Sequence, residues 1–381
     1  MLLHELRQVE RLCLTLAVLL TLLSGCLEVF PNSGKTPGVT LTADVTHTIQ
    51  IRSRTPTATA TLALPSLTPT ITLTPTLTPT ATPTLDPMSI AAMRARTYPG
   101  SDIVIDSELD PGSNYHRYYA YYLSDGLKIY GLLTVPNGSM PAGGWPAIVF
   151  NHGYIPPAQY RTIERYVAYV DSLASHGYVV YKIDYRGHDR SEGVAAGGYG
   201  NPGYEDDVLN ALASLERFPQ VNPQKIGMWG HSMGGFLTLR AMVISKDIKV
   251  GVIWSGVVGS YADMLCCWHV HGGPTPTPPP ESHGGWHGWI QQYGTPGENP
   301  QFWDSISATS FLGDLSGPLQ LHHDLNDSEV PYAFSKTLAD EAQAAGKTVE
   351  LYSYPGDDHN LAGPFSLAMS RTIQFFDHSL K

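Results

Sequence analysis

A serine between small residues is the first feature of this sequence that could do chemistry. Residues 225–239 read KIGMWGHSMGGFLTL, so Ser232 is the centre of a G-x-S-x-G pattern with Gly230 and Gly234. An apolar run that suits a strand precedes the pattern, and a run that suits a helix follows it. At such a strand-to-helix turn, small neighbours let a strained serine project its hydroxyl as a nucleophile. The alternative interpretation is an ordinary small residue at a bend, and residues elsewhere in the chain must decide.

A serine nucleophile needs a general base and a carboxylate that orients the base. His359, in YPGDDHNLAGP, follows the last apolar run that predicts a strand, and Asp327, in LHHDLNDSEVP, follows the run before it. Because ligand sites lie beyond the carboxyl ends of parallel strands, we predict a catalytic triad of Ser232, Asp327 and His359. Five residues compete for these roles, three within or just after a strand and two too close to His359 to orient its ring: His322, His323, Asp324, Asp357 and Asp358.

The tetrahedral intermediate of such a reaction carries an oxyanion, which backbone N–H groups can bind. Met233 directly follows the nucleophile and is predicted to supply one N–H group. Tyr154 follows NHG at the end of an earlier apolar run and is predicted to supply the second.

Strands and helices are expected to alternate along the body of the chain. The helical spacing of apolar residues and the short continuous apolar runs together predict a mainly parallel sheet with helices on both faces, which is an α/β fold. Strands are expected at 117–123 and 127–136 (a hairpin), 146–153, 178–187, 225–230, 249–256, 317–324 and 348–356. Helices are expected at 161–177, 204–218, 234–245, 331–346 and 364–380.

Residues 257–316 form a connection far longer than an ordinary loop and are predicted to be a lid insertion over the site. Three of its aromatic residues are predicted to line a substrate pocket, or alternatively to pack the lid onto the body: Trp268, Trp286 and Trp289. Histidines at 269, 271, 283 and 287 have spacings that a metal can use, but no third motif fixes a geometry, so no metal is expected. Cys266 and Cys267 are adjacent, and two thiols are expected rather than a bond between neighbours.

The first 97 residues are expected to be a leader and a tether. A basic start and a short apolar run predict a signal peptide over 1–25, and LSGC resembles a bacterial lipobox, which implies lipidation of Cys26. Residues 26–97 contain a Thr/Pro-rich tract that cannot build a core, so they are expected to be a disordered tether. The hydrolase domain is then predicted over 98–381, held at a membrane outside the cytoplasm by the lipid on Cys26.

The motifs of the body resemble the α/β-hydrolase superfamily and, within it, the catalytic domain of the prolyl oligopeptidase (S9) serine peptidases. The resemblance spans roughly residues 115–380 and is carried by NHGY, DYRGHDRSEG, NPQKIGMWGHSMGGFLTL, HHDLNDSEVP and YPGDDHN. In that family the catalytic aspartate lies four residues after a histidine and four before a proline, which His323, Asp327 and Pro331 match. Two departures weaken the peptide assignment: Asp324 stands where the family usually has glycine, and no β-propeller is expected before residue 98.

The resemblance implies a serine hydrolase that works without a cofactor through an acyl-enzyme and acts on small peptides. A carboxylesterase or cutinase-like polyester hydrolase is the alternative, because esterases share the same constellation, and an inactive binding lipoprotein is a third. The chain of 381 residues carries a net charge of −11 and has no basic stripe, so nucleic acid is not expected as a partner. The sequence leaves the oligomeric state open.

Overall fold

The computed structural model describes residues 85–268, 285–356 and 358–381, with the side chains of the second range described from 288 onward. Within these residues, nine strands form one sheet in the order β1-β2-β3-β5-β4-β6-β7-β8-β9. The strands are β1 (Val104–Leu109), β2 (Tyr115–Ser124), β3 (Leu127–Pro136), β4 (Trp145–Asn151), β5 (Val179–Ile183), β6 (Val221–His231), β7 (Gly251–Trp254), β8 (Leu319–Asp324) and β9 (Val349–Tyr354).

The sheet changes direction at one junction. Strands β1, β2, β3 and β5 pair antiparallel in turn, whereas β5, β4, β6, β7, β8 and β9 pair parallel. The six parallel strands therefore end at the same edge, with β6 near the centre and β9 at the border. This agrees with the predicted mainly parallel sheet.

Alternate residues of each central strand enter two different hydrophobic clusters, as the two-residue period of a strand requires. In β4, Ala147 and Val149 join one cluster, and Ile148 and Phe150 join the other. Because both faces are apolar, both must be covered, and this explains why the strands read as continuous apolar runs.

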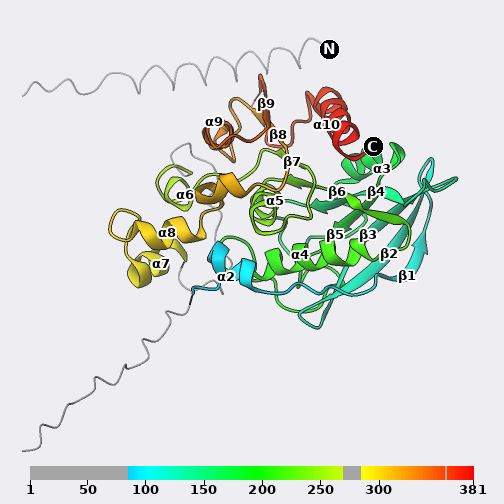
Figure 1. Ribbon diagram of the computed structural model, residues 1–381, viewed down its shortest axis with the longest axis horizontal. Helices are drawn as coiled ribbons and strands as arrows, with labels where there is room; N and C mark the ends of the chain where they lie inside the picture. Colours follow the sequence, from blue (N-terminus) through cyan, green and yellow to red (C-terminus); the bar gives the residue numbers. More distant parts are fainter. Residues whose placement is uncertain (1–84, 269–284, 357) are drawn as a thin grey trace, which may run out of the picture. The chain divides into compact units, whose positions relative to one another are not determined.

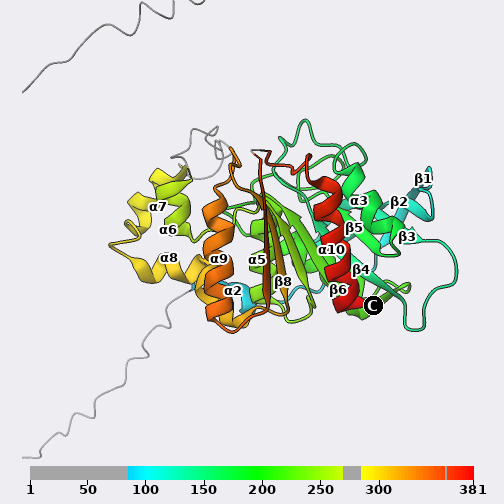
Figure 2. The same ribbon diagram turned by 90° about the horizontal axis from the view of Figure 1, so that it is seen from above.

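The helices divide between the two faces. Buried residues of α3 (Val167–Ser175) and α10 (Phe365–Leu380) belong to one cluster. Those of α2 (Ile90–Ala95), α4 (Gly203–Glu216), α5 (Met233–Ile244) and α9 (Tyr332–Ala344) belong to the other. Figures 1 and 2 show this arrangement, with the strands running between α9 on one side and α10 on the other.

The insertion 257–316 is folded where it is described. It contains α6 (Tyr261–Cys267), α7 (Gly285–Tyr293), α8 (Pro300–Ile306) and the 3-10 helix η1 (Ala308–Asp314). Tyr261, Met264, Trp303 and Ile306 are buried in the same cluster as α5. Helices α6 and α8 of the insertion thus share the hydrophobic core of the body, and Figure 1 shows them beside α5.

Two elements differ from the sequence prediction at the start of the body. Residues 85–97, assigned to the tether, carry α2, and Met88, Ile90 and Met93 of this segment are buried in the core. The packed body therefore begins before residue 98. Strand β1 was not predicted, because it lies at the sheet edge and none of its residues is buried.

Within the described residues, none of the helices combines the length and the apolar character that crossing a membrane requires.

Candidate active site

Ser232 lies at the turn between β6 and α5 in a backbone conformation that few residues adopt. Its φ is 55° and its ψ is −119°, outside the regions that L-residues normally occupy. Backbone hydrogen bonds fix this strained turn: the Ser232 N–H donates to the Trp254 carbonyl (3.0 Å), and the Val257 N–H donates to the Ser232 carbonyl (3.1 Å). The structure thus has the strained elbow that the G-x-S-x-G pattern predicts.

The two glycines of the pattern are required by close approach rather than by unusual dihedral angles. A Cβ on Gly234 would lie 1.9 Å from the Asn151 carbonyl oxygen at the end of β4. A Cβ on Gly230 would lie 2.2 Å from the Gly234 carbonyl oxygen. Only glycine lets α5 begin this close to the neighbouring strand.

Asp327 and His359 lie in contact. The loops that follow β8 and β9 bring the Asp327 Oδ2 atom to 2.8 Å from the His359 Nδ1 atom. Since an ionised carboxylate only accepts hydrogen bonds, the proton of a neutral imidazole resides on Nδ1 and Nε2 keeps its lone pair. This is the tautomer that a general base requires.

The Asp327 carboxylate is held ionised by its surroundings. Its Oδ1 atom accepts the N–H groups of Glu329 (2.8 Å) and Val330 (3.0 Å), and the His323 Nε2 atom lies 3.3 Å from Oδ2. Burial raises the pKa of this carboxyl, but the hydrogen bonds from His323, His359 and Val330 outweigh it and hold the pKa well below its usual range.

The Nε2 atom of His359 is buried and has no hydrogen-bond partner among the described residues. The His359 ring lies 4.7 Å from the ring of His231, which directly precedes Ser232, so the base and the elbow are neighbours. Ser232 and His359 make no direct hydrogen bond in this structure. Such bonds between a nucleophile and its base are often long without substrate. The half-exposed carboxylate of Glu329 lies 3.9 Å from Nε2, beyond hydrogen-bond distance.

The two predicted oxyanion donors, Met233 and Tyr154, belong to segments that lie next to Ser232. The Met233 N–H begins α5, so it has no acceptor within the helix. The loop that carries Tyr154 is pressed against the serine, because a Cβ on Gly153 would lie 3.1 Å from the Ser232 Cβ atom. Among the hydrogen bonds of the described residues, none is donated by the Tyr154 N–H. Its side chain is exposed.

Sequence reasoning missed the residues that hold these loops together. The Asp324 carboxylate accepts the Asp358 N–H (3.2 Å) and thereby ties the loop before His359 to the end of β8. The buried His231 and the partly buried Tyr166 connect the elbow with the loops of Gly153 and His359. The predicted helix 161–177 begins only at Val167, since Tyr166 has a φ of 58°. Contacts between residues so distant in the chain leave no signal in local sequence patterns.

The lid tryptophans that the structure describes make packing contacts. Trp268 is buried, donates its indole N–H to the Glu329 carbonyl (2.8 Å) and packs edge-on against Tyr199. Trp289 stacks on Tyr261 at a ring distance of 5.9 Å. The side chain of Trp286 lies outside the described residues. These contacts agree with the packing alternative, and the pocket role stays a prediction.

Cys266 and Cys267 are joined by a disulfide, so the expectation of two thiols was wrong. The histidines at 269, 271, 283 and 287 lie outside the described side chains. Among the described residues there is no group of three side chains that could hold a metal ion.

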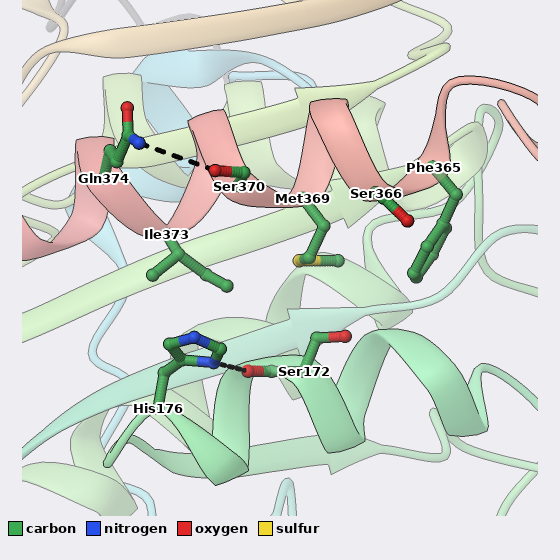
Figure 3. A pocket seen from close by; sticks show the side chains of 8 residues that line it. All are labelled: Ser172, His176, Phe365, Ser366, Met369, Ser370, Ile373 and Gln374. Atoms are coloured by element: carbon green, nitrogen blue, oxygen red, sulfur yellow. Dashed lines mark hydrogen bonds between the residues drawn. The ribbon is translucent and has the colours of Figure 1, made fainter.

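A groove of about 380 Å³ lies between α3 and α10, away from these residues. Figure 3 shows Ser172 of α3 and His176, which follows the end of α3, facing Phe365, Met369 and Ile373 of α10. None of the predicted catalytic residues lines this groove, so it is not the candidate active site.

Comparison with solved structures shows the α/β-hydrolase fold. Pyrococcus horikoshii acylaminoacyl peptidase superposes with a TM-score of 0.54 at 23% identity, covering 71% of this chain and 42% of that chain. An acetyl xylan esterase from Paenibacillus sp. R4 superposes with a TM-score of 0.53 at 18% identity, covering 75% and 91%.

Sequence relatives are peptidases. Human dipeptidyl peptidase 8 is 25% identical over 259 residues, which is 65% of this chain but 26% of the relative. The uncharacterized peptidase YtmA of Bacillus subtilis is 26% identical over 256 residues, 65% of this chain and 88% of the relative. The chain thus spans about a quarter of dipeptidyl peptidase 8 and most of the smaller bacterial relative.

Residues 165–381, more than half of the chain, match the prolyl oligopeptidase family. That range contains the strained serine elbow and the Asp327–His359 contact. The chain therefore belongs to the prolyl oligopeptidase family.

Proposed function

We propose that this protein hydrolyses acyl bonds through a Ser232–His359–Asp327 triad, and that its substrates are small peptides. The observation that carries the proposal is the 2.8 Å contact between Asp327 and His359, next to a serine held at a strained elbow. Membership of a peptidase family and peptidase relatives support the choice of peptides.

In the proposed reaction, the Ser232 Oγ atom attacks the substrate carbonyl carbon while His359 Nε2 takes the hydroxyl proton. The oxyanion that forms is stabilised by the N–H groups of Met233 and Tyr154, each worth about 2.7–4 kcal/mol. The C–N bond then breaks as His359 returns the proton to the leaving amine, which leaves an ester on Ser232. Water, deprotonated by His359, hydrolyses that ester and regenerates the serine.

An esterase is the second candidate. The acetyl xylan esterase that superposes on this fold is covered over 91% of its length, whereas the acylaminoacyl peptidase is covered over 42%. An ester bond needs the same nucleophile, base and oxyanion donors. The two functions therefore differ in substrate binding rather than in the triad.

A fluorophosphonate probe tests the reaction class, because it phosphonylates only an activated serine. We expect labelling of the wild-type protein and its loss in Ser232→Ala. Ser255→Ala is the control, since Ser255 also has a positive φ (46°) but is fully buried. A folded wild-type protein that stays unlabelled would contradict the proposal. Turnover of p-nitrophenyl esters without turnover of peptide p-nitroanilides would replace the peptidase by the esterase.

We further propose that Cys26 is lipidated and anchors the protein at a membrane outside the cytoplasm, with the Thr/Pro-rich segment as a tether. The LSGC sequence supports this proposal. We expect Cys26→Ser to move the protein from the membrane fraction to the soluble fraction, with Cys13→Ser as the control. Unchanged membrane retention of Cys26→Ser would count against the anchor.

A further inference from the structure

A partly buried chain of hydrogen bonds passes next to the candidate nucleophile and links the loop of Gly153 with the loop of His359. The Gly153 N–H donates to the Tyr166 hydroxyl (2.9 Å), and this hydroxyl lies 2.7 Å from the Nδ1 atom of His231. The Nε2 atom of His231 lies 3.0 Å from the carbonyl oxygen of His359. One side chain of the G-x-S-x-G pattern therefore reaches both the oxyanion loop and the loop of the base.

The position of each proton in this chain follows from its ends. The Tyr166 oxygen accepts the Gly153 N–H, so its own proton is available to His231 Nδ1, which must accept it. The His359 carbonyl can only accept, so His231 Nε2 must carry the proton and donate it. Every polar atom of the chain is then satisfied by a single arrangement, with His231 neutral.

The surroundings of His231 keep it in that form. The residue is buried, and burial together with the neighbouring His359 lowers its pKa to about 3. Its ring is 4.7 Å from the His359 ring, so a second positive charge would oppose protonation of the base. A neutral donor to the backbone holds the loop without adding charge beside the base.

We propose that His231 is a positioning residue, which together with Tyr166 fixes the oxyanion loop and the His359 loop relative to Ser232. The inference rests on the proposed role of Ser232 and His359. It predicts that loosening this chain lowers the rate of the chemical step, because small displacements of reacting groups cost much of the rate, while substrate binding changes little.

Three variants separate the hydrogen bonds toward Gly153 from the hydrogen bond toward His359. His231→Leu removes both hydrogen bonds, and Tyr166→Phe removes the hydroxyl alone. His231→Gln keeps a donor near the position of Nε2 and loses the acceptor at Nδ1. We expect His231→Leu to lower kcat on an activated ester about 10- to 100-fold with KM within about twofold, as for supporting residues at other sites. We expect His231→Gln to recover at least a third of the lost activity on a logarithmic scale.

The matched control is His322→Leu, which removes another buried histidine from β8, a parallel strand separated from β6 by β7. His322 contacts Tyr354 and Gln320 and none of the candidate catalytic residues. We expect this variant to lose thermal stability but to keep kcat per folded molecule. Equal kcat losses in His231→Leu and His322→Leu would mean that His231 acts only through general stability, and would overturn the inference.

A double-mutant cycle tests whether the hydrogen bonds of Tyr166 and His231 act as one unit. We expect His231→Leu combined with Tyr166→Phe to lose no more activity than His231→Leu alone, because both break the same connection. Losses that multiply would overturn the inference.

Fluorophosphonate labelling of the wild type distinguishes failure of this inference from failure of the proposed function. A wild type that is labelled, together with an unchanged rate in His231→Leu, rejects the positioning role alone. An unlabelled wild type rejects the triad and with it this inference.

Discussion

At the scale of single residues, the Asp327 carboxylate joins more of the site than any other candidate side chain. One oxygen faces His359 and His323, and the other accepts two backbone N–H groups from the residues that follow it. The carboxylate therefore fixes both the tautomer of the base and the turn that presents Glu329 beside it. Asp324 competes with Asp327 for the orienting role in the sequence. In the structure, its carboxylate instead accepts a backbone N–H group from the loop before His359.

Asp327→Asn should leave the fold intact and remove most of the activity. The amide oxygen can still accept the N–H groups of Glu329 and Val330, which leaves the NH₂ group facing His359 Nδ1. That group donates, so the His359 proton must move to Nε2, and the base loses its lone pair toward Ser232. We expect kcat to fall on the order of 10³–10⁴-fold, measured on an activated ester.

Asp324→Asn is the matched control for this change. Its oxygen can still accept the Asp358 N–H, so we expect less than a tenfold loss of kcat. A loss in Asp324→Asn as large as that in Asp327→Asn would assign the orienting role to the wrong carboxylate.

At the scale of elements, the site depends on how closely α5 approaches the end of β4. Gly234 lies against the backbone of Asn151, which cannot move without breaking the pairing of β4 with β6. The tight turn at Ser232 and this contact are two consequences of the same short distance.

Gly234→Ala should therefore disrupt the junction of the two elements. A methyl group 1.9 Å from a backbone oxygen must push α5 away from the sheet, and we expect a loss of at least about 3 kcal/mol in the free energy of unfolding. Gly313→Ala is the control, because a Cβ there meets no atom within 4 Å, and we expect a change within about 0.5 kcal/mol. Urea unfolding of both variants measures the difference, and equal stabilities would contradict the packing account.

The sequence predicts an element where the burial of that element leaves a local pattern of apolar residues. The parallel strands are continuous apolar runs because both faces are covered, so β4 to β9 were predicted. Strand β1 (VIDSEL) lies at the edge and has no fully buried residue, so it has no such run. Helix α2 is six residues long and follows a linker-like segment, and only tertiary contacts show that Ile90 and Met93 are buried.

The same distinction applies to the site. Ser232, Asp327 and His359 could be chosen from their positions after predicted strands. The roles of His231 and Tyr166 could not, because they depend on a helix that begins late and on contacts across 65 residues.

At the scale of the whole molecule, buried ionisable groups of opposite kinds set the response to pH. Burial holds His322 neutral and, with the nearby Arg371, lowers its pKa to about 3. Burial raises the pKa of Asp184 to about 6 and that of Glu205 to about 7. As pH falls from 7, the folded state gains stability from the two carboxyls, which bind protons before the unfolded chain does. It loses stability from the histidine, which the unfolded chain protonates first.

A single variant isolates the histidine contribution. Between pH 6 and pH 4 an unfolded histidine, with a pKa of 6.5, gains a proton that the folded His322 does not accept. The wild type therefore loses stability toward low pH by an amount that approaches about 1.4 kcal/mol per pH unit from this group, and His322→Gln does not. We expect the stability advantage of the wild type over His322→Gln to shrink by up to about 2.5 kcal/mol across this interval, measured by urea unfolding at each pH. An advantage that stays constant would show that His322 is protonated alike in the folded and unfolded states. It would contradict the claim that burial keeps His322 neutral in the folded protein.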